Sequence, residues 1–363
     1  MTETHRKGWN PYWFWAGVAV VTIGLVHLFQ PVLLPFVAGI LLAYLLDPPV
    51  NRLTRLGLGR GWATLVVLLV FAVLLVGVLL LVVPMLQQQL SDMITKLPDL
   101  IASLQDKVMK LIATLRTRVS AQDMQRLQDA VGGHAGDILG VLPDVLLGLL
   151  TKGLALFNVL SLVFITPVVA FYMMRDWPLI VATVDGWLPK RQAPTIRRLF
   201  VEMDQKLSGY IRGVSMICII LAVFYGTALS AVGLDFGLVV GLLAGFLAFI
   251  PFVGSIFGFV VGVGLAFAQF SDLTSVALVA AVFLIGQAVE GNVLQPMLVG
   301  RQVNLHAVWI IFALLAGGAV FGFLGVLLAV PFAVVIAVLV RYGIEQYRES
   351  QLYLGDGGPP PGR

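Results

Sequence analysis

The chain has 363 residues, of which 59% are hydrophobic and 12% are charged, and its net charge is +4. A soluble globular domain has about twice that charged fraction, so the composition excludes a soluble protein and predicts an all-α polytopic membrane protein in the lipid bilayer. The few basic residues lie mostly in short loops, which indicates membrane topology and no nucleic-acid partner. A single cysteine, Cys218, and four scattered histidines predict no disulfide, no metal site and no cofactor.

Hydropathy predicts about eight transmembrane helices together with shorter apolar pieces. The long candidate spans cover residues 12–29, 31–46, 62–84, 151–174, 207–232, 273–290 and 322–341. Pieces at 236–250, 255–270 and 305–319 fall short of the roughly 20 apolar residues that one crossing needs. Such pieces are tolerated at membrane depth where they are buried in protein or line a cavity, so broken or re-entrant helical hairpins are expected.

The first apolar block is divided by Pro31 and Pro35 into two legs that are expected to form a hairpin. No small-residue cleavage site follows the first leg, so a retained helix is expected rather than a signal peptide. The second leg is expected to end at Asp47, Pro48 and Pro49, with Asp47 as a cap.

Basic residues predict the orientation of the spans, because cytoplasmic loops carry an excess of Lys and Arg. The basic residues near predicted span ends are Arg6, Lys7, Arg52, Arg55, Arg60, Arg175, Lys190, Arg191, Arg197, Arg198, Lys206, Arg341 and Arg348. An even number of crossings separates these groups when 236–250 and 255–270 act as one hairpin. Both termini are therefore expected in the cytoplasm, with residues 85–150 outside.

The segment 85–150 is predicted to be a helical, extracytoplasmic segment. Its apolar positions are spaced alternately by three and four residues, which is the stripe of a coiled coil or a packed hairpin. Pro98 is expected to start a new helix, and another is expected from Ser120 to Ala130. The stripe predicts either a helix that folds back on its own subunit or a contact between subunits, and both readings stay open.

Pro251 separates two glycine-rich pieces and prevents one helix from running through both. A glycine stands at every fourth position on each side, at Gly237, Gly241, Gly245, Gly254, Gly258 and Gly262. On a helix this spacing forms a strip without side chains, which lets neighbouring helices in lipid approach closely. The junction at Pro251 and Gly254 is predicted to line a transport path, with a plain turn between two tilted spans as the alternative.

Glu290 is the sharpest candidate for chemistry. A carboxylate at membrane depth commonly pairs with another group, binds a cation or relays a proton. Asn292 and Gln295 place amide groups near it, and Pro296 limits regular helix. With Gln287 one turn earlier, these residues predict a site for a small polar solute or a dehydrated cation. The alternative is a carboxylate wetted by headgroups at the cytoplasmic end of its span.

Arg212 lies near the predicted cytoplasmic start of a span. Snorkelling of its side chain to the interface explains it simply, and a salt bridge to Glu290 is the functional alternative. Asp235 is expected to be a solvated loop residue or a helix cap, and Arg175 with Asp176 an interfacial pair.

These features divide the chain into five segments. The segments are N-terminal transmembrane helices at 1–84, an extracytoplasmic helical segment at 85–150, a transmembrane helix with a basic cytoplasmic loop at 151–206, a C-terminal transport core at 207–345 and a flexible tail at 346–363.

Several blocks of sequence together resemble the autoinducer-2 exporter (AI-2E) family of bacterial transporters. The blocks are Asp47-Pro48-Pro49-Val50, Ile250-Pro251-Phe252-Val253-Gly254, Glu290-Gly291-Asn292-Val293-Leu294-Gln295-Pro296, Leu305-His306 and 322–331. The Glu-x-Asn-x-x-Gln-Pro pattern is the specific part, and the hydropathy layout agrees over nearly the whole chain. Ser255 and Ala307 stand where family members frequently have proline.

The resemblance implies an all-helical homo-oligomer, with five subunits as the expected number, that exports a small polar solute. Members are associated with the quorum-sensing signal autoinducer-2 and with Na⁺/H⁺ antiport. Three hypotheses follow: an exporter whose solute movement is coupled to an ion by Glu290, a sodium/proton antiporter that exchanges ions at Glu290, and a non-transporting scaffold that recruits a partner through residues 85–150. No zinc-protease, serine-hydrolase or P-loop signature occurs, so no enzymatic activity is predicted.

Overall fold

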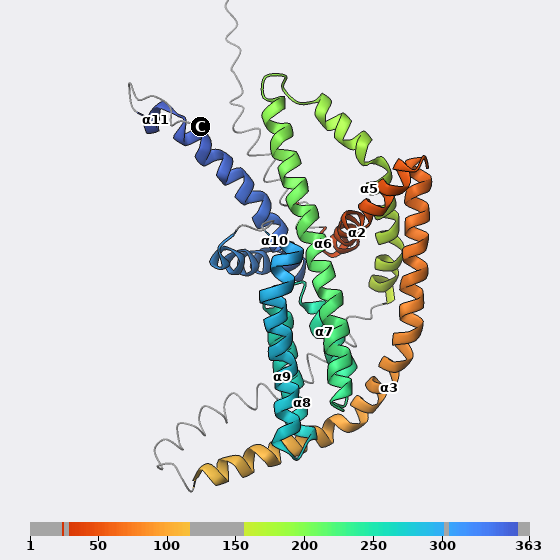
Figure 1. Cartoon of the computed structure of the whole chain (residues 1–363), viewed down its shortest axis with the longest axis vertical. Coiled ribbons are helices and arrows are strands. Elements are labelled where there is room, and N and C mark those ends of the chain that lie inside the picture. The colour runs from red at the N-terminus through yellow and green to blue at the C-terminus, as the bar shows by residue number, and fades with distance from the viewer. Residues whose placement is uncertain (1–23, 25–28, 117–155, 301–304, 355–363) are drawn as a thin grey trace, which may run out of the picture.

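The computed structural model describes residues 24, 29–116, 156–300 and 305–354, and over these residues it contains helices and no strand. The helices, labelled as in Figure 1, are α2 (Gln30–Arg55), α3 (Arg60–Arg116), α5 (Leu156–Gly186), α6 (Ala193–Ala231), α7 (Gly237–Leu247), α8 (Val253–Gln269), α9 (Leu273–Val289), η1 (Glu290–Val299), α10 (Ala307–Arg348) and α11 (Gln351–Leu354). The prediction of an all-α protein is confirmed.

Six stretches of helix in the described residues are long and apolar enough to cross a membrane. They are Val32–Arg55, Arg60–Gln89, Leu162–Gly186, Ala193–Ala231, Leu273–Val299 and Ala307–Arg348. The short apolar helices α7 and α8 follow α6 in the chain. This arrangement confirms a polytopic membrane protein. The predicted span 12–29, apart from Gly24 and Phe29, and the helix predicted from Ser120 to Ala130 lie outside the described residues.

The helices pack in two groups. The first group contains α2, α5 and the start of α3, around a small core that includes Val50 and Met174. The second contains α6, α7, α8 and α9, around a larger core that includes Leu221 and Phe283. Helix α10 packs on α6 through Val334. In Figure 1, α3 runs along the outside of the molecule, and its far end reaches the end of α8.

Glycines bring α7 against α6. A Cβ atom on Gly241 would lie 2.3 Å from the backbone N of Gly226, and one on Gly245 would lie 2.2 Å from that of Ala222. A Cβ atom on Gly237 would also meet backbone atoms of α6, 2.8 Å away. Real Cβ atoms do not approach backbone this closely, so the two helices can pack at this distance only with glycine on α7.

The glycines of α8 accommodate an aromatic ring instead. Cβ atoms on Gly258 and Gly262 would lie 2.6 Å and 2.4 Å from ring atoms of Phe283 in α9. The ring is 3% exposed and fills the strip that the two glycines leave open. The helices α8 and α9 therefore pack closely because α9 supplies the large side chain and α8 has glycine opposite it.

Three prolines that the sequence assigns to helix boundaries, Pro48, Pro49 and Pro98, lie inside helices. Helix α2 does not end at Asp47, Pro48 and Pro49 but continues to Arg55. No new helix begins at Pro98, because α3 is continuous from Arg60 to Arg116. A proline can bend a helix without ending it, and Figure 1 shows that α3 is curved.

Two segments predicted to be irregular are largely helical. Most of the predicted basic loop is helix, since α5 extends to Gly186 and α6 already begins at Ala193. Helices α10 and α11 continue beyond residue 346, where the sequence predicts a tail. Hydropathy marks only the part of a helix that lies in lipid, and a polar sequence can extend the same helix into water.

Candidate functional site

Glu290 stands at the point where α9 changes into the π-helix η1. Helices α9 and η1 form one candidate span, Leu273–Val299, in which Glu290 is the only charged residue. Its side chain is half-buried. The helix does not end at residue 290 but continues to Val299. Glu290 therefore lies within this candidate span and not at the end of its helix.

The wide turn of the π-helix brings the amide of Gln295 to the carboxylate. Residues five apart are hydrogen-bonded along the backbone of a π-helix, and Gln295 Nε2 donates to Glu290 Oε1 at 3.3 Å. Asn292 Nδ2 donates at 2.8 Å to the carbonyl of Ala288, one turn earlier, so this amide group is hydrogen-bonded within its own helical segment. Gln287 and Pro296 are exposed, and Pro296 lies within η1 without ending it.

Helix α6 faces α9 and η1 in antiparallel register. A Cβ atom on Gly286 would lie 2.4 Å from the ring of Tyr225, and one on Gly213 would lie 2.4 Å from the carbonyl oxygen of Leu298. Glu290 lies between these two contacts along the chain. It thus belongs to the segment that packs tightly against α6.

Tyr225 places an unused hydrogen-bond donor beside this segment. The residue is 2% exposed, and its ring centroid lies 5.0 Å from that of Phe283. Its hydroxyl has no hydrogen-bond partner among the described residues. A buried hydroxyl without a partner costs about 1–3 kcal/mol. The hydroxyl of Tyr225 lies against Gly286, one helical turn before Glu290, so this cost falls next to the candidate site.

The break at Pro251 lies at the same end of the core as Glu290. Helices α7 and α8 are joined by a tight turn in which Phe252 has a left-handed φ of 69°. A Cβ atom on Gly254 would lie 2.4 Å from the backbone N of Ala248, so glycine is required for this turn. Because α8 and α9 are antiparallel neighbours, the first turn of α8 lies beside the last turn of α9.

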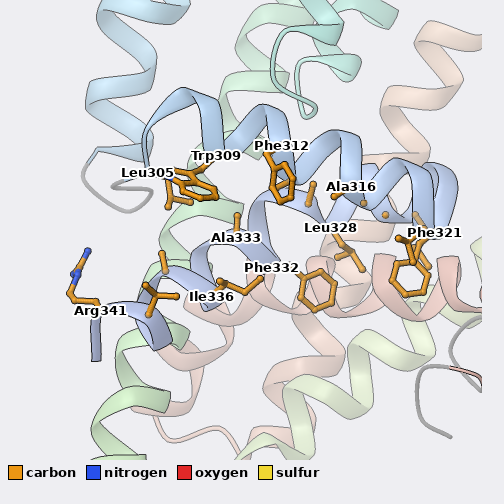
Figure 2. Close-up of a pocket in the computed structure, with 18 of the residues that line it drawn as sticks. Leu305, Trp309, Phe312, Ala316, Phe321, Leu328, Phe332, Ala333, Ile336 and Arg341 are labelled. Atoms are coloured by element: carbon orange, nitrogen blue, oxygen red, sulfur yellow. The ribbon is translucent and has the colours of Figure 1, made fainter. Parts of the chain in front are cut away.

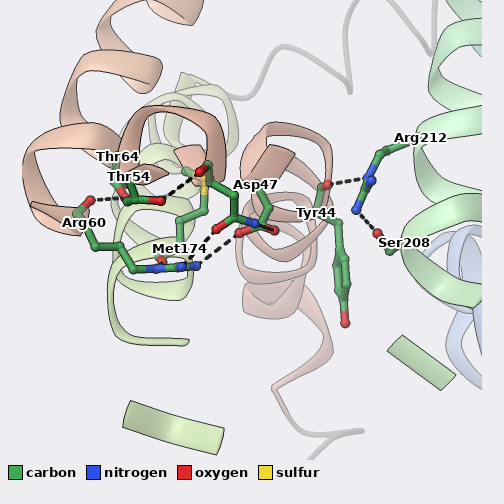
Figure 3. Close-up of polar contacts among 9 residues, drawn as sticks. Tyr44, Asp47, Thr54, Arg60, Thr64, Met174, Ser208 and Arg212 are labelled. Atoms are coloured by element: carbon green, nitrogen blue, oxygen red, sulfur yellow. Dashed lines mark hydrogen bonds and ion pairs between the residues drawn. The ribbon is translucent and has the colours of Figure 1, made fainter. Parts of the chain in front are cut away.

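Arg212 belongs to a different polar cluster, and no ion pair joins it to Glu290. Its guanidinium donates to the hydroxyl of Ser208 and, at 3.3 Å, to the carbonyl of Tyr44 in α2 (Figure 3). Pro48 has no N–H to donate to that carbonyl four residues earlier. Arg212 supplies the missing donor, which explains how α2 passes through Pro48 without ending.

Arg60 performs the same task between α3 and α5. Its Nε donates at 2.7 Å to the carbonyl of Met174, which Pro178 leaves without a helical donor. Its two Nη atoms bind Asn51 Oδ1 at 3.0 Å and Asp47 Oδ1 at 3.1 Å, as Figure 3 shows for Asp47. Asp47 is therefore an ion-pair partner inside α2 and not the cap that the sequence predicts.

The predicted outer loops of the core are bound by α3. Lys96 Nζ pairs with Asp235 at 3.3 Å. Lys107 Nζ donates at 2.8–3.0 Å to three carbonyls at the end of α8, those of Phe267, Ala268 and Phe270. Asp235 is thus an ion-pair partner as well as a loop residue. These side chains of the predicted extracytoplasmic segment bind their own subunit.

Sequence reasoning missed Tyr225 and both arginine–carbonyl pairs. A proline inside a helix signals a free carbonyl, so Pro48 and Pro178 carried part of the information, although they do not identify the donor. Nothing in the sequence around Tyr225 distinguishes it from an ordinary core residue. In the described part of the chain no three His, Cys, Asp or Glu side chains gather closely enough to hold a metal ion.

Together, the broken helices and the half-buried carboxylate inside a span define a polytopic membrane protein of the transporter class. The chain belongs to the AI-2E transporter family, whose profile matches residues 17–345. It is 31% identical over 327 residues to PerM of Escherichia coli K12, named as a permease, with 89% of this chain and 91% of PerM covered. It is 28% identical over 351 residues to YrrI of Bacillus subtilis 168, named as a transport protein, with 94% and 91% covered. It is 24% identical over 337 residues to TqsA of E. coli K12, named as an AI-2 transport protein, with 92% of each chain covered.

Proposed function

We propose that this protein is a secondary transporter that exports a small polar solute similar to autoinducer-2, and that Glu290 couples this export to an ion. The observation that carries the proposal is a half-buried carboxylate that is the only charged residue within a candidate membrane span. Such carboxylates in membranes typically bind cations, relay protons or contact a substrate. The relative TqsA, named as an AI-2 transport protein, supports the substrate class.

The coupling follows from the chemistry of one carboxylate. Glu290 can hold a proton or a cation but not both, so occupation by one releases the other. Gln295 donates to one carboxylate oxygen at 3.3 Å and leaves the other oxygen available. The break at Pro251 lies at the same end of the core as this group, where a change in the short helices would open or close access to it.

The experiment compares wild type with Glu290→Gln in proteoliposomes that contain a pH-sensitive dye. Addition of sodium, lithium or autoinducer-2 to wild type should produce proton flux, and Glu290→Gln should abolish it. The matched control is Asp272→Asn, which changes a carboxylate at the N-terminus of α9, outside the span. Hydrogen bonds from Ser275 lower the pKa of Asp272, so this control also removes a charge that is fully present at neutral pH. Undiminished proton flux in Glu290→Gln would refute the coupling.

A sodium/proton antiporter is the second candidate, and the same carboxylate favours it. The two functions differ in whether an organic solute is needed for proton movement. Sodium-dependent flux in liposomes without any solute would support antiport, whereas flux that requires autoinducer-2 would support export.

The scaffold hypothesis places the function in residues 85–150 and predicts no transport. The described polar contacts of this segment, Lys96 with Asp235 and Lys107 with the end of α8, are made within the subunit, which favours a structural role in the transporter. Deletion of residues 90–140 separates the hypotheses: a scaffold would lose its partner while no variant, including wild type, showed flux.

The five-segment division, the cytoplasmic location of both termini, the inner membrane of a bacterium and an assembly of five subunits complete the proposal. The positions of the basic residues support the orientation. Cysteine accessibility at each terminus in intact cells tests the orientation, and the mass of the purified particle tests the subunit number.

A further inference from the structure

A large cavity lies between the two legs of α10, away from the residues around Glu290. Its volume is about 1000 Å³. Trp309, Phe312 and Ala316 of the first leg face Leu328 and Phe332 of the second across it (Figure 2). The cavity is part of one subunit, and α2 contributes to its wall.

The two legs are fixed to each other at one end of the cavity. Phe321 and Gly322 have non-helical backbone angles, which reverse the direction of α10. A Cβ atom on Gly317 would lie 2.5 Å from the carbonyl oxygen of Gly325, so the legs touch backbone to backbone beside the bend. The cavity extends from this closed end at Phe321 to Arg341 at the opposite end (Figure 2).

The lining separates into a long apolar part and a short charged end. Every charged residue that lines the cavity lies in the last turns of α10, namely Arg341, Glu345 and Arg348. Two positive charges thus stand against one negative charge. Arg341 also pairs with Glu202 at 3.6 Å, whereas Arg348 forms no ion pair with another described residue. An apolar cavity with excess positive charge at one end is complementary to an anionic amphiphile.

The cavity is long enough to hold one lipid. From Leu324 to Arg341 the second leg rises about 26 Å at 1.5 Å per residue. One leaflet with its headgroups is roughly 20–22 Å thick, so a single lipid fits between the closed end and the arginines. The predicted orientation places Arg341 and Arg348 at the cytoplasmic leaflet, which carries anionic lipids.

We propose that this cavity is a binding site for an anionic phospholipid of the cytoplasmic leaflet. The acyl chain lies between the legs of α10 with its end near Phe321, and Arg341 and Arg348 bind the phosphate. The excess of positive charge at the mouth favours an anionic lipid over an uncharged apolar occupant. The inference does not rest on the proposed coupling at Glu290.

The test measures lipid retained by the full-length protein, purified in a neutral detergent, with native mass spectrometry. Phosphatidylglycerol and phosphatidylcholine with identical acyl chains are titrated separately. Each arginine at an anionic lipid surface contributes roughly fivefold in affinity, so wild type should prefer phosphatidylglycerol by about 30-fold. Arg341→Gln with Arg348→Gln should remove this preference, and Arg348→Gln alone should remove part of it without disturbing the pair of Arg341 with Glu202.

Two further variants locate the binding site. Ala316→Trp fills the cavity near its middle and should reduce retention of both lipids. Arg191→Gln with Arg198→Gln is the charge-matched control, since these exposed arginines lie outside the cavity, and it should preserve the preference. Equal retention of the two lipids by wild type would overturn the proposal, as would lipid retention unchanged by Ala316→Trp. Dissociation of an oligomer by Ala316→Trp without loss of lipid would assign the cavity to a second copy of the chain and would also overturn it.

Discussion

The hydroxyl of Tyr225 provides the most direct test of how this core is built. The residue is buried and its hydroxyl has no hydrogen-bond partner among the described residues. The hydroxyl therefore loses the hydrogen bond that it makes in the unfolded chain and gains none in the folded protein. That loss costs about 1–3 kcal/mol. Tyr225→Phe keeps the ring and its contact with Phe283 while it removes the oxygen. We expect the variant to be more stable than wild type by about 1–2 kcal/mol.

Tyr44→Phe is the matched control, because the hydroxyl of Tyr44 donates to Asp204 at 3.1 Å. A hydrogen bond to a charged group contributes about 1.5–3 kcal/mol, and partial exposure reduces this, so Tyr44→Phe should lose about 1–2 kcal/mol. Both free energies of unfolding are measured by SDS titration in mixed micelles with circular dichroism. Destabilisation of Tyr225→Phe by as much as Tyr44→Phe would refute the reasoning, since the hydroxyl would then have a bonding partner in the folded protein.

Three further variants test the interfaces, the first two by the same unfolding measurement and the third by amide hydrogen exchange. Arg60→Ala leaves the carbonyl of Met174 and Asn51 Oδ1 without a donor and removes the ion pair with Asp47, so it should cost about 2–3 kcal/mol; a loss below about 0.5 kcal/mol would mean that water replaces the guanidinium. Gly241→Ala should cost about 1–3 kcal/mol, because its Cβ meets backbone that cannot rotate away, whereas Gly264→Ala, with no atom within 4 Å of its Cβ, should be neutral or stabilising. Lys107→Met removes donors from three carbonyls at the end of α8 and should speed amide exchange there by about tenfold; unchanged exchange would show that α3 does not hold this end.

The parts of the fold that the sequence predicts well depend on local chemistry. Pro251 and the glycines around it act through their own backbone, so the short pair α7 and α8 was accessible from spacing alone. The kink at Phe321 and Gly322 also falls between two predicted segments, 305–319 and 322–341. Helix ends outside the membrane were harder to predict, because hydropathy reports lipid contact and not helix length.

In the candidate site, too, the sequence predicts the features that depend on local chemistry and misses those that depend on packing. Glu290 stands out in sequence because a charge is rare in an apolar run, and its bond to Gln295 arises within one helix. The continuation of the helix beyond Glu290 was not predictable, since the following residues form a π-helix. Tyr225 was missed because its significance comes from the absence of a partner, which only the packing of α6 against α9 reveals.

Internal prolines explain one error of sequence reasoning and one contact between the two helix groups. Pro48 and Pro178 each remove one helical donor, and the sequence-based prediction places the end of a helix at Pro48. Here Arg212 of α6 and Arg60 of α3 donate to those carbonyls. A carbonyl left without a donor in one helix thus accepts a hydrogen bond from another helix. The prolines therefore act as attachment points between helices, and their partners, more than 100 positions away in the chain, are visible only in the folded structure.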